Sequence, residues 1–173
     1  MKQAYVNMRQ FWLDVKNLES RKGVIEIGSD HIAAAGIEMA LADGPVIKHL
    51  FLATNSLGDS SLYFENNSKS GLGGFIGGHG NERLQTAAAH MLAHAAKLTG
   101  QMQSCPLAAG LPAPSAAGQV RLFAVSKEKI FHIEFAEANL RDPKHPFYAF
   151  FAYSQQTLGF FRAQQASSPQ ARA

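Results

Sequence analysis

The sequence predicts an α+β fold, in which a single, mainly antiparallel sheet packs with a few helices. Two stretches, residues 3–19 and 81–99, carry apolar side chains at helical spacing. Elsewhere, two pairs of strand-like runs are each joined by a turn, which predicts two hairpins. The 173 residues suit one domain, which we place at residues 1–165. The polar, Ser-rich segment 166–173 is expected to be a disordered tail.

The composition is that of a globular chain, and the charge pattern argues against one class of partner. Apolar residues make up 46% and charged residues 17% of the sequence. The formal net charge is +3, but the basic residues are scattered. The longest stretch without an acidic residue, between Glu82 and Glu128, holds only Arg83, Lys97, Arg121 and Lys127. So sparse a set of cations disfavours nucleic acid as a partner.

The cysteine content and the hydropathy pattern bear on location. Cys105 has no second cysteine with which to form a disulfide, and it cannot build a cysteine-based zinc site alone. Residues 1–20 lack the apolar core of a secretory leader, and no apolar run is long enough to cross a membrane. We therefore expect a cytoplasmic protein that has no membrane partner.

The first third of the chain is expected to begin with a helix and to continue with strands. Over residues 3–19 the helical stripe consists of Tyr5, Met8, Trp12 and Val15. After Gly23 the pattern indicates a strand, a turn at Ser29 and Asp30, and a second strand. Residues 33–41 of that second strand are also compatible with a helix.

Two hairpins are predicted from turn residues between apolar runs. The runs are residues 46–55 with 60–67, and residues 119–126 with 129–136. Gly58 and Asp59 supply the first turn, and Lys127 and Glu128 supply the second. The proline-rich segment 101–118, which precedes the second hairpin, is expected to be a long loop.

A helix over residues 81–99 has clear start and stop signals. Asn81 suits the N-cap, Glu82 complements the helix dipole in the first turn, and Gly100 ends the helix. The stripe expected to face the core is Leu84, Ala88, Met91, Leu92, Ala95 and Leu98. The opposite, polar stripe is expected to hold His90 and His94 together with Arg83, Lys97 and Gln101.

The four-residue spacing of His90 and His94 would let two imidazoles share a metal ion. A zinc-protease helix, however, needs a glutamate where this sequence has Met91. Because the neighbouring side chains are cationic, we favour a solvated or interface-facing polar stripe. A metal-dependent enzyme built from His79, His90 and His94 remains the alternative. No catalytic residue and no cofactor is otherwise indicated.

The glycine run at residues 71–80 contains six glycines and is expected to be a loop. A dinucleotide-binding fingerprint would need a third glycine at Ile76, and a phosphate loop would need Lys and Ser or Thr at His79 and Gly80. The run is therefore either a flexible connector or a generic anion site at a helix N-terminus. The residues of the candidate anion site are Gly77, Gly78, His79, Gly80 and Asn81.

The stretch "HIEF" at residues 132–135 contains the H-x-E pattern of zinc deaminases. The downstream P-C-x-x-C of that signature is missing. The pattern instead favours an ordinary strand, with Phe131, Ile133 and Phe135 on one side and His132 and Glu134 on the other.

An aromatic run near the C-terminus has two interpretations. Its members are Phe147, Tyr148, Phe150, Phe151 and Tyr153. Residues 146–163 form either a strand over 147–153 followed by a short helix, or one helix that begins at Pro146. As a strand, the run would be apolar on both faces. It would then lie in the core, at a subunit interface or in an apolar ligand pocket.

Three stretches share the element order of a known family: "MRQFWLDVKNLESRKGVIEIGSDHIAAAG", "AAAHMLAHAAKLTG", and "VRLFAVSKEKIFHIEFA" with "FYAFFAYSQQTLGFF". In this order they resemble the roadblock/dynein light chain family of profilin-like folds. The resemblance implies a non-catalytic dimeric module that pairs sheets or helices and often serves small GTPases or assembly platforms. Residues 38–78 depart from the pattern, since such domains pass almost directly from the second strand to the second helix.

We therefore expect a non-catalytic interaction or regulatory module that forms a homodimer and binds a protein partner. The aromatic run and the last helix are expected to lie in or near the dimer interface. The alternative is a small-ligand sensor with an apolar pocket between the sheet and the helix at residues 81–99.

Overall fold

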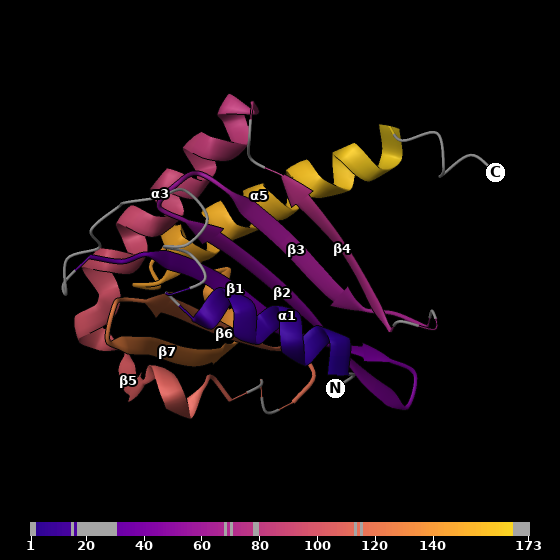
Figure 1. Ribbon diagram of the computed structural model, residues 1–173. Helices are drawn as coiled ribbons and strands as arrows, with labels where there is room; N and C mark the ends of the chain where they lie inside the picture. The colour runs from indigo at the N-terminus through magenta and orange to yellow at the C-terminus, as the bar shows by residue number, and fades with distance from the viewer. Residues whose placement is uncertain are drawn as a thin grey trace.

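The computed structural model describes residues 3–14, 16, 31–67, 69, 71–77, 80–112, 114 and 116–167. Its seven strands form one sheet in the order β4-β3-β2-β1-β6-β7-β5, and every neighbouring pair is antiparallel (Figure 1). The strands are β1 (Ala34–Asp43), β2 (Val46–Asn55), β3 (Ser60–Glu65), β4 (Leu72–Gly77), β5 (Gln103–Pro106), β6 (Gln119–Val125) and β7 (Lys129–Ala136). The helices are α1 (Gln3–Leu13), α3 (Glu82–Leu98), α4 (Glu137–Leu140) and α5 (Tyr148–Ser167), with 3-10 turns at Thr99–Gln101 and Leu107–Ala109. The fold is α+β.

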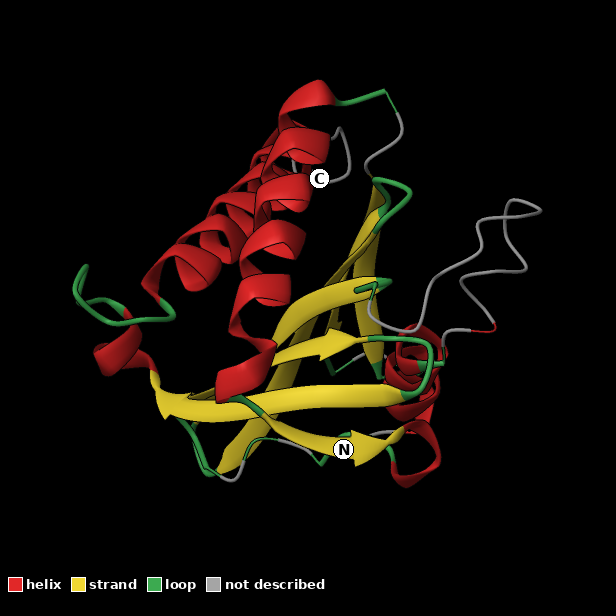
Figure 2. Ribbon diagram, turned by 90° about the vertical axis from the view of Figure 1, so that its left-hand side faces the viewer, coloured by secondary structure: helices red, strands yellow, loops and turns green. Residues whose placement is uncertain are grey.

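The sheet is covered on both faces, which gives three layers. Figure 2 shows α3 and α5 together on one side of the sheet and α1 on the other. Ile37, Leu52 and Leu122 of the central strands face α3 and α5. Phe51 and Phe123 face α1, and their rings stack with centroids 5.0 Å apart.

Gly36 lets the central strands approach closely. A Cβ atom at this position would lie 1.9 Å from the Leu52 carbonyl oxygen and 2.6 Å from the Phe123 ring. Because both neighbours are in the core, no side chain fits there. The glycine therefore fixes how β1 packs between β2 and β6.

The structure confirms both predicted hairpins and the predicted helix start. The hairpins are β2–β3 and β6–β7. The Asn81 side-chain oxygen accepts a hydrogen bond from the Leu84 N–H at 3.1 Å, so Asn81 caps α3. Residues 33–41, for which a helix was the alternative, lie almost entirely in β1.

The glycine run was wrongly predicted to be a loop, because residues 72–77 form strand β4. The glycines make room for aromatic rings of neighbouring elements. A Cβ at Gly73 would lie 2.3 Å from the Phe64 ring, and one at Gly77 would lie 3.2 Å from the Phe161 ring. Tertiary packing thus outweighs the low strand propensity of glycine.

Three further predictions are corrected in the C-terminal half. Residues 146–163 are not a strand followed by a helix, because α5 runs without a break from Tyr148 to Ser167. The segment 101–118 is not wholly a loop, since it contains β5 and the 3-10 turn Leu107–Ala109. α5 also extends two residues into the segment 166–173 that was expected to be a tail.

Several predictions lie partly or wholly outside the described residues. These are the strand after Gly23, the turn at Ser29 and Asp30, and the tail beyond residue 167. The helix predicted over residues 3–19 is described as α1, which ends at Leu13.

Candidate functional site

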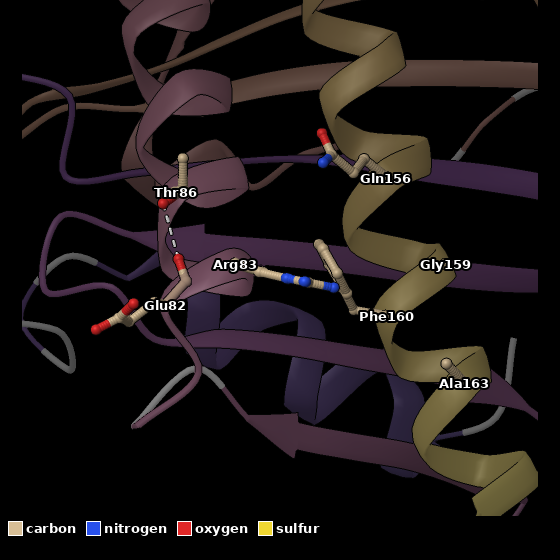
Figure 3. A pocket seen from close by; sticks show the side chains of 7 residues that line it. All are labelled: Glu82, Arg83, Thr86, Gln156, Gly159, Phe160 and Ala163. Carbon is tan, nitrogen blue, oxygen red and sulfur yellow. Dashed lines mark hydrogen bonds between the residues drawn. The ribbon is translucent and has the colours of Figure 1, made fainter.

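An open groove of about 910 Å³ lies between α3 and α5 (Figure 3). It is lined by Glu82, Arg83 and Thr86 of α3 and by Gln156, Gly159, Phe160 and Ala163 of α5. The two helices run side by side over the same face of the sheet (Figure 2). The N-terminal turns of α3 and the C-terminal half of α5 therefore form its two walls.

The two walls differ in chemistry. On α5, Gly159 and Ala163 have little or no side chain, and the Phe160 ring is half-buried. On α3, Glu82 and Arg83 are exposed, and Arg83 extends toward the α5 side (Figure 3). Within the described part of the chain neither of these two charges forms an ion pair. The groove thus offers apolar surface beside one acidic and one basic group, which suits an amphipathic peptide segment.

Farther along the same pair of helices, beyond the groove, the side-chain rings of α3 and α5 stack on one another. The Tyr153 ring of α5 stacks on His90 and on His94 of α3, with centroids 4.8 Å and 5.5 Å apart. In the stripe predicted to be solvated or interface-facing, His90 is exposed and His94 is half-buried. Burial, with Lys97 and His90 nearby, lowers the pKa of His94 below its usual value.

The candidate anion residues are split by the structure. Gly77 ends β4, Gly80 has a φ of 75°, and Asn81 uses its side-chain oxygen to cap α3. Gly78 and His79 lie outside the described residues. The acidic Glu82 in the first turn of α3 adds a negative charge where an anion would bind.

The aromatic run is largely covered by the chain itself. Phe147, Phe150 and Phe151 are 3%, 0% and 4% exposed and lie in the core between the sheet and the helices. Tyr148 and Tyr153 are half-buried. Because the three phenylalanines are core residues, substituting them would test stability rather than association.

The space between α3 and the sheet, where the sensor hypothesis places a pocket, is filled by core side chains. Leu84, Met91 and Ala95 of α3 are fully buried there. Leu92, also expected in the core stripe, is only half-buried. The groove described above lies instead between α3 and α5.

On the opposite face of the sheet, α1 is held by buried polar groups. Arg9 of α1 binds the Glu38 carboxylate of β1 through Nε and Nη2, at 2.8 to 3.0 Å. The Tyr5 hydroxyl donates to the same carboxylate at 2.9 Å. Burial, with Glu38 nearby, raises the pKa of Tyr5. All three residues are at most 7% exposed.

The polar cluster under α1 continues across the sheet toward β7. Arg9 Nη2 donates to the Pro112 carbonyl at 3.0 Å, and Arg121 donates to the same oxygen. Arg121 also pairs with Glu134, the acidic residue of the "HIEF" stretch. Burial and Arg121 lower the pKa of His132. His132 and Glu134 thus lie on the α1 face, and Phe131, Ile133 and Phe135 lie on the other face, as the alternation predicts.

These groups attach α1 to the sheet through hydrogen bonds and ion pairs. Both carboxylates are paired with arginines, and that of Glu38 is fully buried. Sequence reasoning missed them, although two signals were present. Arg9 lies between Tyr5 and Trp12 on the apolar stripe of a helix, and Glu38 interrupts an apolar strand.

Other kinds of site find no support in the described residues. No three His, Cys, Asp or Glu side chains among them lie close enough together to hold a metal ion. Burial raises the pKa of the Cys105 thiol, which makes it a poorer nucleophile. None of the described helices has the length and hydropathy that spanning a membrane requires.

Comparison with known proteins does not assign the chain to a family. No protein-family model matches the chain, and no curated protein matches it either.

Proposed function

We propose that this chain is a non-catalytic protein-interaction module that acts as a homodimer. The observation that carries the proposal is the groove between α3 and α5, which combines the exposed small residues Gly159 and Ala163 with the half-buried Phe160. In contrast, the carboxylates of Glu38 and Glu134 on the α1 side of the sheet are engaged in ion pairs with arginines. Accessible apolar surface with polar groups at its rim is typical of sites that bind protein segments.

The groove has the features of a helix-binding site. Gly159 and Ala163 are four residues apart on α5, so they share one face, and neither projects a long side chain. A Cβ at Gly159 would meet no atom within 4 Å. A partner helix can approach α5 closely at these two positions, while Glu82 and Arg83 are placed to contact its polar face. The roadblock-like pattern implies small GTPases as the first class of partner to test.

Site-specific photo-cross-linking in cells that express the chain tests this function. A photoreactive phenylalanine at Ala163 is expected to cross-link one recurrent partner. A second copy of the chain is distinguished from another protein by mass. The matched control is the same amino acid at Gly100, a position that also faces open space but lies outside the groove.

A blocking variant completes the test. Gly159→Leu fills the groove and is expected to abolish the cross-link from position 163, whereas Gly100→Leu leaves it unchanged. Cross-linking from positions 163 and 100 to the same set of background proteins would contradict the proposed function.

A small-ligand sensor is the second candidate, and the volume of the groove favours it. About 910 Å³ lies within the range of small-molecule sites. A metabolite that raises the melting temperature of the wild type, but not of Gly159→Leu, would favour this candidate.

A further inference from the structure

In the part of the chain that the structure describes, the β4 edge of the sheet has no charge, proline or further strand to protect it. Among the described residues β4 pairs only with β3. Its sequence, LGGFIG, contains no charged residue and no proline. The opposite edge strand, β5, has only four residues, ends in Pro106, and leads into a 3-10 turn. The two edges of one sheet are therefore protected very differently.

The register shows which groups of β4 point outward. The Asn66 N–H donates to the Gly71 carbonyl at 3.1 Å, so this pair is hydrogen-bonded. In an antiparallel ladder such pairs alternate with pairs that are not hydrogen-bonded. Gly73, Phe75 and Gly77 therefore bond to β3, while Gly74 and Ile76 direct their N–H and C=O groups outward.

β4 is fixed in place but exposes apolar surface. The Phe75 ring packs near Phe64 and stacks on Phe161 of α5, with centroids 6.3 Å and 6.2 Å apart. Ile76 points to the other face of the sheet and is 74% exposed. A well-packed strand thus presents outward-directed backbone groups next to an exposed isoleucine, which is the arrangement that strand addition uses.

We infer that β4 pairs antiparallel with β4 of a second copy and joins the two sheets into one. This inference rests on the proposed homodimer and names its interface. A twofold axis brings each residue of β4 opposite a residue of the identical strand. Because residues 71–77 carry no charge, this self-pairing opposes no like charges.

The position of α5 fits the same interface. Phe161 lies over Phe75 and Gly77, so α5 covers β4 on one face. Edge-to-edge pairing about a twofold axis perpendicular to the sheet places both copies of α5 on the same face of the joined sheet. β4 belongs to residues 38–78, the segment that departs from the roadblock-like pattern, so the choice of β4 as the interface does not come from that resemblance.

Two substitutions at one exposed position test the inference. Ile76→Lys adds a charge to the self-paired edge of each copy, and Ile76→Pro removes an outward N–H while leaving the bonds to β3 intact. Both variants are expected to have the mass of one chain, 18.7 kDa, at concentrations where the wild type has twice that mass. The control is Val46→Lys, at a 55% exposed position on the β1–β2 hairpin, which should remain dimeric.

Amide hydrogen exchange measured by NMR adds a residue-level readout. On dilution to monomer, the Gly74 and Ile76 amides are expected to lose protection, whereas the Gly73 and Phe75 amides retain it. A wild-type dimer that survives both Ile76 substitutions would overturn the inference about β4 but leave the proposed function intact. A wild type that is monomeric at every concentration would overturn both the inference and the homodimeric function.

Discussion

Arg9 and Glu38 form a buried ion pair that attaches α1 to the centre of the sheet. The guanidinium Nη2 lies 2.8 Å from Oε2 of the carboxylate, and the two residues are 7% and 0% exposed. Removing only the arginine would leave a buried carboxylate without its cation. We expect Arg9→Met to lower the free energy of unfolding by about 3–5 kcal/mol, measured by urea denaturation.

A combined variant separates charge from packing. Replacing the whole cluster, as Tyr5→Phe with Arg9→Met and Glu38→Met, should recover most of that loss, because no polar group is then left unpaired. If Arg9→Met alone were as stable as the wild type, the pair would not hold α1 in place.

Gly36 is expected to tolerate no side chain. Because its Cβ would lie 1.9 Å from the Leu52 carbonyl oxygen, Gly36→Ala must displace β1 from β2. We expect a loss of about 3 kcal/mol or more in the free energy of unfolding. Gly100→Ala, where a Cβ meets nothing within 4 Å, is the matched control and should change stability by less than about 1 kcal/mol. Equal effects of the two substitutions would contradict the strand packing.

Gly159 is expected to show the opposite behaviour. It lies in an exposed turn of α5, and its Cβ would point into open space. Since alanine is the better helix former, Gly159→Ala should raise the free energy of unfolding by about 1 kcal/mol. The reciprocal change Ala163→Gly, on the same face, should lower it by a similar amount. If Gly159→Ala instead lowered the free energy of unfolding, the space beside Gly159 would not be open.

His132 is expected to reduce stability in mild acid. Its pKa in the folded chain lies below the usual 6.5, chiefly because of burial and then because of Arg121. The unfolded chain therefore binds this proton more tightly, and stability is lost as the pH falls below about 6.5. His132→Gln should show a smaller drop in the free energy of unfolding between about pH 7 and about pH 5 than the wild type. The exposed His31→Gln is the control, and an equal drop in both variants would contradict this origin.

The sequence predicted those elements that depend on residues close together in the chain. Asn81 was recognised as a cap because its partner, Leu84, is three residues away. The hairpins were recognised because their turn residues lie beside the strands. The strand at residues 72–77 was missed, since its glycines are explained only by the rings of Phe64 and Phe161.

The candidate site depended on contacts between distant segments. Arg83 of α3 and Phe160 of α5 both line the groove. The order of elements along the chain does not determine how far apart these two residues lie. The same holds for Arg9 and Glu38, which meet across the layer between α1 and β1. For the aromatic run, the periodicity fitted both a strand and a helix, because its apolar residues are nearly continuous.

Light scattering of the purified wild-type chain, over a series of concentrations, tests the central claim that this is a self-associating interaction module. We predict a mass of twice 18.7 kDa that falls toward a single chain on dilution. A mass of one chain throughout the series, including the highest concentration that remains in solution, would contradict the claim.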